Sequence, residues 1–226
     1  MLVLLDSASL DDAAAAARLG YVGGFTTNPT LMARATSLAG ATTEPLAHFA
    51  ALLEALPEGP GCYQPTGDSP EAMCEEARAA ASLAPARVVI KLPATADGVR
   101  AAATLREESI RCALTAVYSP AQALLAHAVG CVWVIPYVDR AERQGVGGRQ
   151  VIESLAGILR RLESPTRILA ASLKTAEQVT DTVLHGAHDI TAPLDVLAAL
   201  AHHPLTEAAV REFAAQARPS AGARRE

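Results

Sequence analysis

The sequence predicts a single-domain (β/α)8 barrel, and three observations support this fold class. Eight short β-branched or apolar runs alternate with alanine- and leucine-rich stretches of helical length, the order expected of parallel strands joined by helices. One strand plus one helix takes about 28 residues, so eight such units fill the chain. No proline-, glycine- or serine-rich linker divides the 226 residues into two domains.

The expected strands are short and apolar, as strands of a helix-covered parallel barrel should be. They cover residues 2–6, 23–27, 61–64, 87–92, 110–115, 131–137, 167–172 and 188–191. The helices expected between them cover residues 9–19, 29–36 with 44–56, 69–84, 95–107, 119–128, 148–162 and 174–185, and 193–201 follows the last strand. An extra C-terminal helix is expected over 206–217. We expect one barrel domain over residues 1–217 and a flexible polar tail over 218–226.

Several residues mark where these helices begin and end. Asn28, Ser69 and Ser119 each precede a proline, and a capping side chain followed by proline is typical of a helix's first turn. Three glycines follow helices at positions that favour a left-handed backbone: Gly20, Gly130 and Gly186. The capped turns then lie at the C-terminal face of the barrel, where barrel enzymes keep their reactive groups.

Composition excludes several classes of partner. The net charge of −5, with no basic block, argues against a general nucleic-acid binder, because such proteins must neutralise phosphates. The apolar start ends at Asp6, which is too early for a signal peptide, and no segment is long enough to cross a membrane. The four cysteines show no close pairing. We expect a cytoplasmic protein without a disulfide, metal or cofactor.

Lysine is scarce in this chain, with two residues against seventeen arginines, and Lys91 lies near the end of the apolar run over 86–93. A guanidinium stays protonated and is a poor nucleophile, whereas a desolvated lysine can lose its proton and attack a carbonyl. An arginine-rich, lysine-poor composition is also what a GC-rich genome produces. The residues around Lys91 must therefore decide its role.

Strand parity predicts which side chains surround Lys91. Side chains alternate between the barrel interior and the helices, so an inward Lys91 makes Val89 inward too. The same rule groups Leu2 and Leu4 with Asp6, Cys62 with Gln64, Ala113 with Thr115, Trp133 and Ile135 with Tyr137, and Ile168 and Ala170 with Ser172. Seven polar residues are thus expected at one mouth: Asp6, Thr26, Gln64, Lys91, Thr115, Tyr137 and Ser172.

A single polar residue at a strand end more often satisfies backbone groups than it takes part in a reaction. Seven of them around one lysine change that balance. The set contains hydroxyls, an amide and one carboxylate, but no cysteine and histidine cluster for a metal. It therefore indicates carbonyl chemistry through an imine on Lys91.

Six sequence blocks carry a family resemblance. They are LDSA at 5–8, TTNPT at 26–30, VIKLP at 89–93, LTAVYSPAQ at 114–122, PYVDR at 136–140 and AASLK at 170–174. In this order they resemble the small transaldolase family, and most closely its fructose-6-phosphate aldolase group. The resemblance extends from residue 2 to about 217.

The resemblance implies a class I aldol mechanism on a barrel. Lys91 matches the lysine that forms a Schiff base with a ketone donor such as dihydroxyacetone. Tyr137 matches the general acid/base of the aldolase group, at a position where transaldolases carry phenylalanine. Gln64 stands where transaldolases place a glutamate, and with Thr115 it would hold an ordered water.

The resemblance also implies a set of substrate-binding residues. Asp6 and Asn28 match groups that bind donor or acceptor hydroxyls, and Thr26 lines the same mouth. Arg140 and Ser172 match the phosphate site of an aldehyde acceptor, for which a planar guanidinium is well suited. The expected partners are small ketones, aldehydes and sugar phosphates.

Some positions depart from the family pattern. Ser7 replaces the usual threonine and Thr30 the usual serine, which keeps both hydroxyls. Ile135 is larger than the usual alanine and should narrow the donor side towards small ketones such as hydroxyacetone, while Ala113 replaces a leucine and returns some volume. Lys174 has two readings, as an aid to phosphate binding or as a solvated residue at a helix entry.

The sequence leaves three functions open. The first is a lyase that interconverts fructose 6-phosphate with dihydroxyacetone and glyceraldehyde 3-phosphate. The second is a transaldolase, which passes the three-carbon donor between sugar phosphates; Tyr137 and Gln64 favour the first. The third is a barrel that binds a sugar phosphate without turning it over.

Assembly is a further expectation from the resemblance. Relatives of this size form pentamers or decamers in which the last helix reaches over a neighbour, so a homo-oligomer is expected. Residues 206–217 form an amphipathic segment with Val210, Phe213 and Ala214 on one side. The same segment could instead pack on its own barrel.

Overall fold

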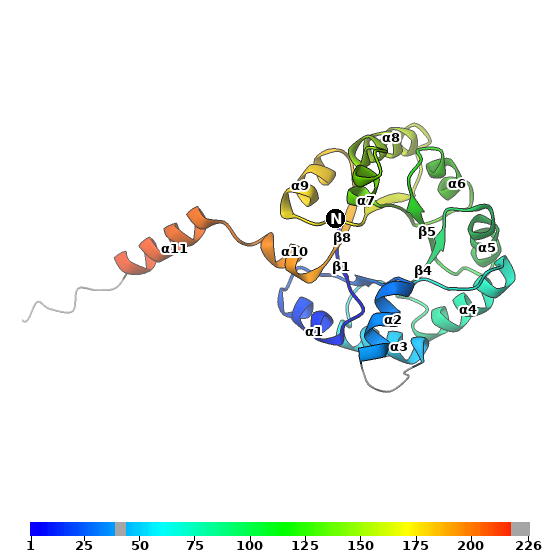
Figure 1. The fold of residues 1–226 in the computed structure, drawn as a ribbon, viewed down its shortest axis with the longest axis horizontal. Coiled ribbons are helices and arrows are strands. Elements are labelled where there is room, and N and C mark those ends of the chain that lie inside the picture. Colours follow the sequence, from blue (N-terminus) through cyan, green and yellow to red (C-terminus); the bar gives the residue numbers. More distant parts are fainter. Residues whose placement is uncertain (39–43, 218–226) are drawn as a thin grey trace, which may run out of the picture.

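The computed structural model describes residues 1–38 and 44–217, and in this part of the chain eight parallel strands close into a barrel (Figure 1). The strands pair in sequence order, and β8 closes the barrel on β1. Their bounds are β1 (Val3–Asp6), β2 (Phe25–Thr26), β3 (Gly61–Tyr63), β4 (Val88–Pro93), β5 (Cys112–Val117), β6 (Trp133–Pro136), β7 (Arg167–Ala170) and β8 (Asp189–Ala192). The predicted (β/α)8 barrel and all eight strands are confirmed.

Most of the helices surround the barrel, whereas the last one, α11, extends away from it (Figure 1). Their bounds are α1 (Leu10–Arg18), α2 (Pro29–Leu38), α3 (Pro45–Ala55), α4 (Pro70–Leu83), α5 (Ala96–Glu107), α6 (Gln122–Ala128), α7 (Val138–Arg143), α8 (Gly148–Arg161), α9 (Ala176–Leu184), α10 (Leu194–Ala199) and α11 (Pro204–Gln216). None of these helices is long and apolar enough to cross a membrane. The tail predicted over 218–226 lies outside the described residues.

The predicted caps are correct at two of three helices. Asn28 Oδ1 accepts from the Leu31 N–H and Ser69 Oγ from the Ala72 N–H, at 3.0 and 3.2 Å. The cap at Ser119 is wrong, because α6 begins three residues later and the Gln122 side chain accepts from the Tyr118 and Ser119 N–H groups instead. The three predicted glycines all have positive φ, as expected: 75° at Gly20, 68° at Gly130 and 111° at Gly186.

One helix was not predicted from the sequence. The six residues of α7 follow β6 directly, and the Tyr137 at its start provides no capping side-chain bond. A helix of fewer than two turns shows no usable hydrophobic period, which is the signal that finds longer helices. This short helix carries Arg140.

Two apolar cores lie on the two faces of the sheet. The larger one packs between the strands and the surrounding helices. The smaller one fills the barrel and consists of Leu4, Cys62, Val89, Ala113, Trp133, Ile135, Leu169 and Ala171. Parity is therefore as predicted on β1, β3, β4, β5 and β6, and the inward face of β4 leads from Val89 to Lys91.

On β7 the predicted parity is wrong. Leu169 and Ala171 face the barrel interior, while Ile168 and Ala170 pack outward against the helices. A strand buried on both faces is apolar at every position, so its sequence contains no alternation from which a face can be chosen. Alternation also stops at Ser172, whose φ of 60° takes the backbone out of strand geometry.

Candidate active site

Lys91 is 3% exposed and extends from β4 inside the barrel. Its Nζ donates a 2.7 Å hydrogen bond to the carbonyl of Thr27, in the turn after β2. That turn is itself anchored, because the N–H and hydroxyl of Thr27 both donate to the Cys62 carbonyl, at 3.0 and 2.9 Å. The amine is therefore held in a defined place near the C-terminal ends of β2, β3 and β4.

Thr115 and Tyr137 form a pair on the next strands of the barrel. The hydroxyl of Thr115, fully buried on β5, donates to the phenol oxygen of Tyr137 at 3.2 Å. The ring of Tyr118 packs edge-on against the Tyr137 ring, with centroids 6.0 Å apart. The phenol uses its oxygen as an acceptor here, so its own proton stays available to another group.

Arg140 lies over the ring of Tyr137. Its guanidinium carbon is 4.8 Å from the centroid of the Tyr137 ring, within the range of a cation–π contact. Arg140 itself is exposed and sits in the first turn of α7. A charged group at the mouth thus contacts the ring that points towards the interior.

Ser172 is joined to the start of α7 through the backbone. The carbonyls of Ala171 and Ser172 accept from the N–H groups of Val138 and Asp139, at 2.9 and 3.2 Å. These bonds fasten the end of β7 to the helix that carries Arg140. The two residues predicted to bind phosphate therefore lie on adjoining segments.

A chain of three hydroxyl and carboxylate groups crosses from β8 to β1. Thr26 Oγ1 donates to Asp6 Oδ1 at 3.0 Å and is 2.8 Å from Thr191 Oγ1. A hydroxyl has one proton, and that of Thr26 goes to Asp6, so Thr191 must be the donor in the second bond. Thr26 and Thr191 are buried, while Asp6 is partly exposed and available to a ligand.

Gln64 follows β3 directly and is level with Lys91, because Tyr63 pairs with Ile90 in the register of β3 and β4. Its Oε1 is buried, and within the described residues it has no hydrogen-bond partner. Buried polar atoms are nearly always satisfied, by protein or by ordered water. The geometry therefore leaves an acceptor at the height of Lys91.

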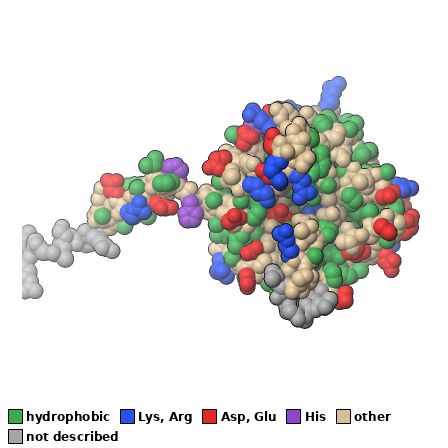
Figure 2. All heavy atoms as spheres, in the orientation of Figure 1, with side chains coloured by type: hydrophobic (Ala, Val, Ile, Leu, Met, Phe, Trp, Pro, Cys, Tyr) green, Lys and Arg blue, Asp and Glu red, His purple; other side chains and the backbone are tan. Residues whose placement is uncertain are grey.

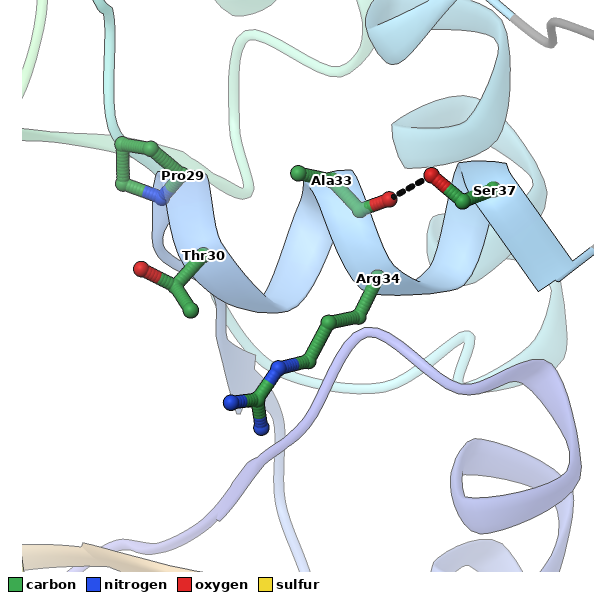
Figure 3. Close-up of a pocket in the computed structure, with 5 residues that line it drawn as sticks. All are labelled: Pro29, Thr30, Ala33, Arg34 and Ser37. Carbon is green, nitrogen blue, oxygen red and sulfur yellow. Dashed lines mark hydrogen bonds between the residues drawn. The ribbon is translucent and has the colours of Figure 1, made fainter.

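Asn28 and α2 border the mouth from the β2 side. Asn28 Oδ1 caps α2, which leaves its amide N–H groups for other partners. A hollow of about 720 Å³ lies along α2, and Thr30 and Arg34 extend from the same side of the helix (Figure 3). Pro29, Ala33 and Ser37 complete its lining, so this hollow contains none of the predicted site residues.

Positive charge collects on this face of the molecule. Figure 2 shows Lys and Arg side chains gathered near its middle, beside α7 and α2. Both helices follow the C-terminal ends of strands, β6 and β2. The chain as a whole carries a net charge of −5, so the concentration of cations here is local and favours an anionic ligand.

Cys62 belongs to the interior core two residues before Gln64. Burial raises the pKa of its thiol to about 12, although the charges of Lys91 and Arg111 act in the opposite direction. The thiol is therefore protonated near neutrality and is not a nucleophile. All four cysteines are buried and free.

Sequence reasoning missed three residues of the site. Thr27 supplies the carbonyl that holds Lys91, Thr191 donates to Thr26, and Tyr118 packs on Tyr137. Thr191 had a usable signal, since it lies at the end of a predicted strand. The other two act through a backbone carbonyl and a ring edge, and neither contact follows from residue type.

The fold and the mouth define the class of this protein. It is a (β/α)8 barrel whose C-terminal face holds a buried lysine, several hydroxyls and nearby cations, the arrangement in which barrel enzymes bind and convert small molecules. Sequence comparison gives the family: the family described as Transaldolase/Fructose-6-phosphate aldolase matches residues 3–224. The chain belongs to this family of enzymes, and the resemblance read from its sequence blocks is confirmed.

Curated relatives agree over nearly the whole length. A probable transaldolase of Roseiflexus sp. (strain RS-1) is 35% identical over 218 residues, which cover 95% of this chain and 96% of the relative. A probable transaldolase of Thermus thermophilus is 36% identical, over 94% of this chain and 96% of the relative. A probable transaldolase of Desulforudis audaxviator is 35% identical, over 94% of this chain and 95% of the relative. These names correspond to the second of the three functions left open by the sequence.

Proposed function

We propose that this protein is a class I aldolase that cleaves and forms a carbon–carbon bond through a Schiff base on Lys91. The observation that carries the proposal is a buried amine, fixed by the Thr27 carbonyl, in a mouth that also holds the Thr115–Tyr137 pair. The substrates are a dihydroxyacetone-type ketone and an aldehyde. Fructose 6-phosphate, which yields dihydroxyacetone and glyceraldehyde 3-phosphate, has both parts.

The proposed cleavage begins when the neutral Lys91 amine attacks the C2 carbonyl of the ketose phosphate. Loss of water gives an iminium ion. Removal of the C4 hydroxyl proton forms the aldehyde at C4, while the electrons of the C3–C4 bond move into the iminium and leave an enamine. Protonation at C3 and hydrolysis then release dihydroxyacetone and restore the amine.

Tyr137 is the proposed proton carrier in these steps, acting with an ordered water. Thr115 donates to the phenol oxygen, so the phenol proton is directed elsewhere. The unpartnered Oε1 of Gln64, level with Lys91, is the proposed acceptor for that water. Asp6, Thr26 and Asn28 are proposed to hold hydroxyls of the substrate, with Asp6 ordered by its bond from Thr26.

Arg140 and Ser172 are the proposed phosphate contacts. Arg140 is exposed at the mouth, and the segments that carry the two residues are joined by backbone hydrogen bonds. A planar guanidinium binds a phosphate through two parallel hydrogen bonds. We propose the helix-entry role for Lys174, which is exposed and whose N–H donates to Gln178 Oε1 at 2.7 Å.

The transaldolase reading is the main alternative, and the names of the curated relatives favour it. Tyr137 and Gln64 favour the lyase, because transaldolases carry phenylalanine and glutamate at these positions. One assay separates the two readings. Fructose 6-phosphate supplied without an acceptor should release free dihydroxyacetone and glyceraldehyde 3-phosphate; transfer that requires an added aldose phosphate would instead identify a transaldolase.

The covalent step has its own test. Borohydride reduction in the presence of dihydroxyacetone should add the donor's mass to the peptide that contains Lys91. Lys91→Arg should abolish the adduct, while Lys174→Arg, which changes the only other lysine, should retain it. Folded protein that binds fructose 6-phosphate but gains no mass with any short ketone would be a binding barrel without catalytic activity.

Donor size is a further part of the proposal. Ile135 is fully buried in the interior core, on the same face of β6 as Tyr137. Its side chain fills volume where the family has alanine, and Ala113 on the neighbouring strand returns part of it. We propose that the donor side accepts hydroxyacetone more readily than dihydroxyacetone.

The assembly is proposed to be a homo-oligomer, a pentamer or decamer. Helix α11 lies away from its own barrel (Figure 1) and contains no buried residue. Leu205, Val210 and Phe213 on it are 73%, 58% and 65% exposed. Apolar residues this exposed on one helix favour burial against another copy of the chain.

A further inference from the structure

A second concave site lies at the opposite end of the barrel. A cavity of about 310 Å³ opens among the N-terminal ends of the strands and is called here the lower pocket. Its principal lining residues are Leu2, Val89, Arg87, Arg111, Trp133 and Arg167. Val89 and Trp133 belong to the interior core, so the pocket extends into the barrel from below. The volume is at the low end for small-molecule sites, about 300–1,000 Å³.

Two of the three arginines in this pocket have no anionic partner. Arg87 donates to the backbone carbonyls of Leu53, Leu56 and Gly59, at 2.9, 2.6 and 2.8 Å. Arg111 donates to the Ala86 carbonyl at 2.6 Å. Among residues 1–38 and 44–217, neither guanidinium forms an ion pair with a carboxylate. Both guanidinium groups are held by neutral backbone carbonyls, so no carboxylate among the described residues offsets their positive charges.

Arg167 is different, because it is neutralised locally. It makes two 2.7 Å bonds to Asp189, whose side chain is fully buried. The pKa values follow this difference: burial lowers that of Arg87, whereas the hydrogen bond to Asp189 raises that of Arg167. The lower pocket thus has about two uncompensated positive charges beside an apolar floor.

Trp133 gives this floor a rigid aromatic surface. Its indole Nε1 donates to Asp189 Oδ2 at 2.9 Å, and the backbone N–H of Leu2 donates to Oδ1 at 2.6 Å. The Asp189 carboxylate therefore accepts hydrogen bonds from Arg167, Trp133 and Leu2, and it forms none with Arg87 or Arg111. A ligand can stack its carbon atoms on the indole while its charged groups meet the arginines.

We propose that the lower pocket binds a small organic dianion, a phosphate monoester or a dicarboxylate, at a site separate from the C-terminal mouth. Guanidinium groups held in place match both oxyanions through charge-assisted hydrogen bonds. The pocket is too small for a nucleotide with its base and sugar. Ligand bound here lies beneath Val89, two residues before Lys91 on the same strand.

Trp133 provides a direct test, because it is the only tryptophan in the chain. Its fluorescence, or its indole N–H signal in an NMR spectrum, is followed while glycerol phosphate, succinate or sodium chloride is added at matched ionic strength. We expect a saturable change with one or both dianions and none with chloride. The ligand that saturates at the lower concentration identifies the anion class.

Variants locate the site. Arg111→Gln should raise the ligand concentration at the midpoint by at least about tenfold, because one charge-assisted contact is lost. Arg111→Lys should have a midpoint between those of Arg111→Gln and the parent protein. Arg140→Gln, at the C-terminal mouth, and Arg100→Gln, on the outer surface, should leave the midpoint unchanged. Arg87 is left intact because it caps carbonyls at the end of α3.

Two results would overturn the proposal. One is a response to the dianions that is no larger than the response to chloride. The other is an unchanged midpoint in Arg111→Gln when the indole signal shows that the variant is folded. Neither readout depends on turnover, so a failure here is distinct from a failure of the proposed aldolase reaction.

Discussion

The hydroxyl of Thr115 donates to the phenol oxygen of Tyr137 at 3.2 Å and joins β5 to the end of β6. A phenol that accepts this bond can give its proton to a water or substrate in the mouth. The contact lies where the two strands shift register, between Leu114 and Val117, with Ala116 at a φ of 57°. An irregular strand end thus sets the orientation of the proposed acid/base.

Tyr137→Phe tests this relationship. Without the phenol, cleavage of fructose 6-phosphate in the absence of an acceptor should fall by roughly 10²–10⁴-fold, the usual contribution of a general acid/base. Borohydride trapping at Lys91 should persist, because the attacking amine is on Lys91 and is held by the Thr27 carbonyl. Tyr118→Phe is the matched control and should change the rate little, since only its ring packs on Tyr137. Equal losses in both variants would contradict the assignment.

Thr191→Val should act on the donor site through Thr26. The substitution keeps the shape but removes the proton that Thr191 gives to Thr26, so the order of Asp6 is reduced. We expect a free energy of unfolding lower by about 1–3 kcal/mol and a higher KM for the ketone with a smaller change in kcat. Thr180→Val, an exposed threonine on α9, is the control. A change in kcat alone would argue against a positioning role.

Ile135→Ala should widen the donor side. The ratio of kcat/KM for dihydroxyacetone to that for hydroxyacetone should rise, because the removed atoms lie on the inward face shared with Tyr137. A cost in stability of about 2–5 kcal/mol is expected, since the side chain is fully buried. Ile168→Ala removes a similar buried side chain on the outward face and should leave the donor ratio unchanged. A ratio that moves equally in both variants would point to loosened packing instead.

The base of the barrel should make the protein sensitive to acid in two steps. Burial, together with the charge of Arg167, lowers the pKa of His188 below its ordinary 6.5, and its Nδ1 accepts from the Ile168 N–H at 3.0 Å. As the pH falls, His188 in the unfolded chain is protonated before His188 in the folded protein. The free energy of unfolding therefore decreases as the pH falls from 6.5 through the lower pKa of folded His188.

The second step belongs to Asp189. Burial alone raises its pKa, but the bonds from Arg167, Leu2 and Trp133 outweigh it and hold the value below 3.8, so further stability is lost as the pH falls below 3.8. Urea midpoints measured in small pH steps should show both losses. His188→Gln should flatten only the first, and an unchanged curve in that variant would refute its assignment to His188.

The exposed face of α11 should hold the proposed assembly together. Val210→Asp with Phe213→Asp should lower the sedimentation coefficient, because charge at a buried apolar contact is costly. Ala208→Asp with Ala215→Asp adds the same charge on the opposite side of the helix and should leave the assembly intact. A parent protein that sediments as a monomer would refute the assembly, while the barrel and the proposed reaction would be unaffected.

The sequence by itself determined the barrel fold and proposed most of the residues of the candidate site. Eight apolar runs separated by helices permit few folds, and strand alternation located the inward face of β4 with Lys91 on it. The alternation worked best where one face ends in a polar residue, as at Asp6 and Tyr137. It failed on β7, because the polar residue that suggested the inward face, Ser172, has a φ of 60° and lies beyond the regular alternation of the strand.

Only the tertiary structure decided the contacts that depend on residues distant in the chain. The carbonyl of Thr27 reaches Lys91 across 64 positions, and Thr191 reaches Thr26 across 165. The arginines of the lower pocket come together from the starts of three different strands, since Arg87 and Arg111 directly precede β4 and β5 and Arg167 begins β7. Only packing shows that, within the described residues, Asp189 neutralises Arg167 and leaves Arg87 and Arg111 without an anionic partner. The alternation of side chains along a strand determines which face of the sheet each one lies on, but closure of the barrel determines which side chains come into contact.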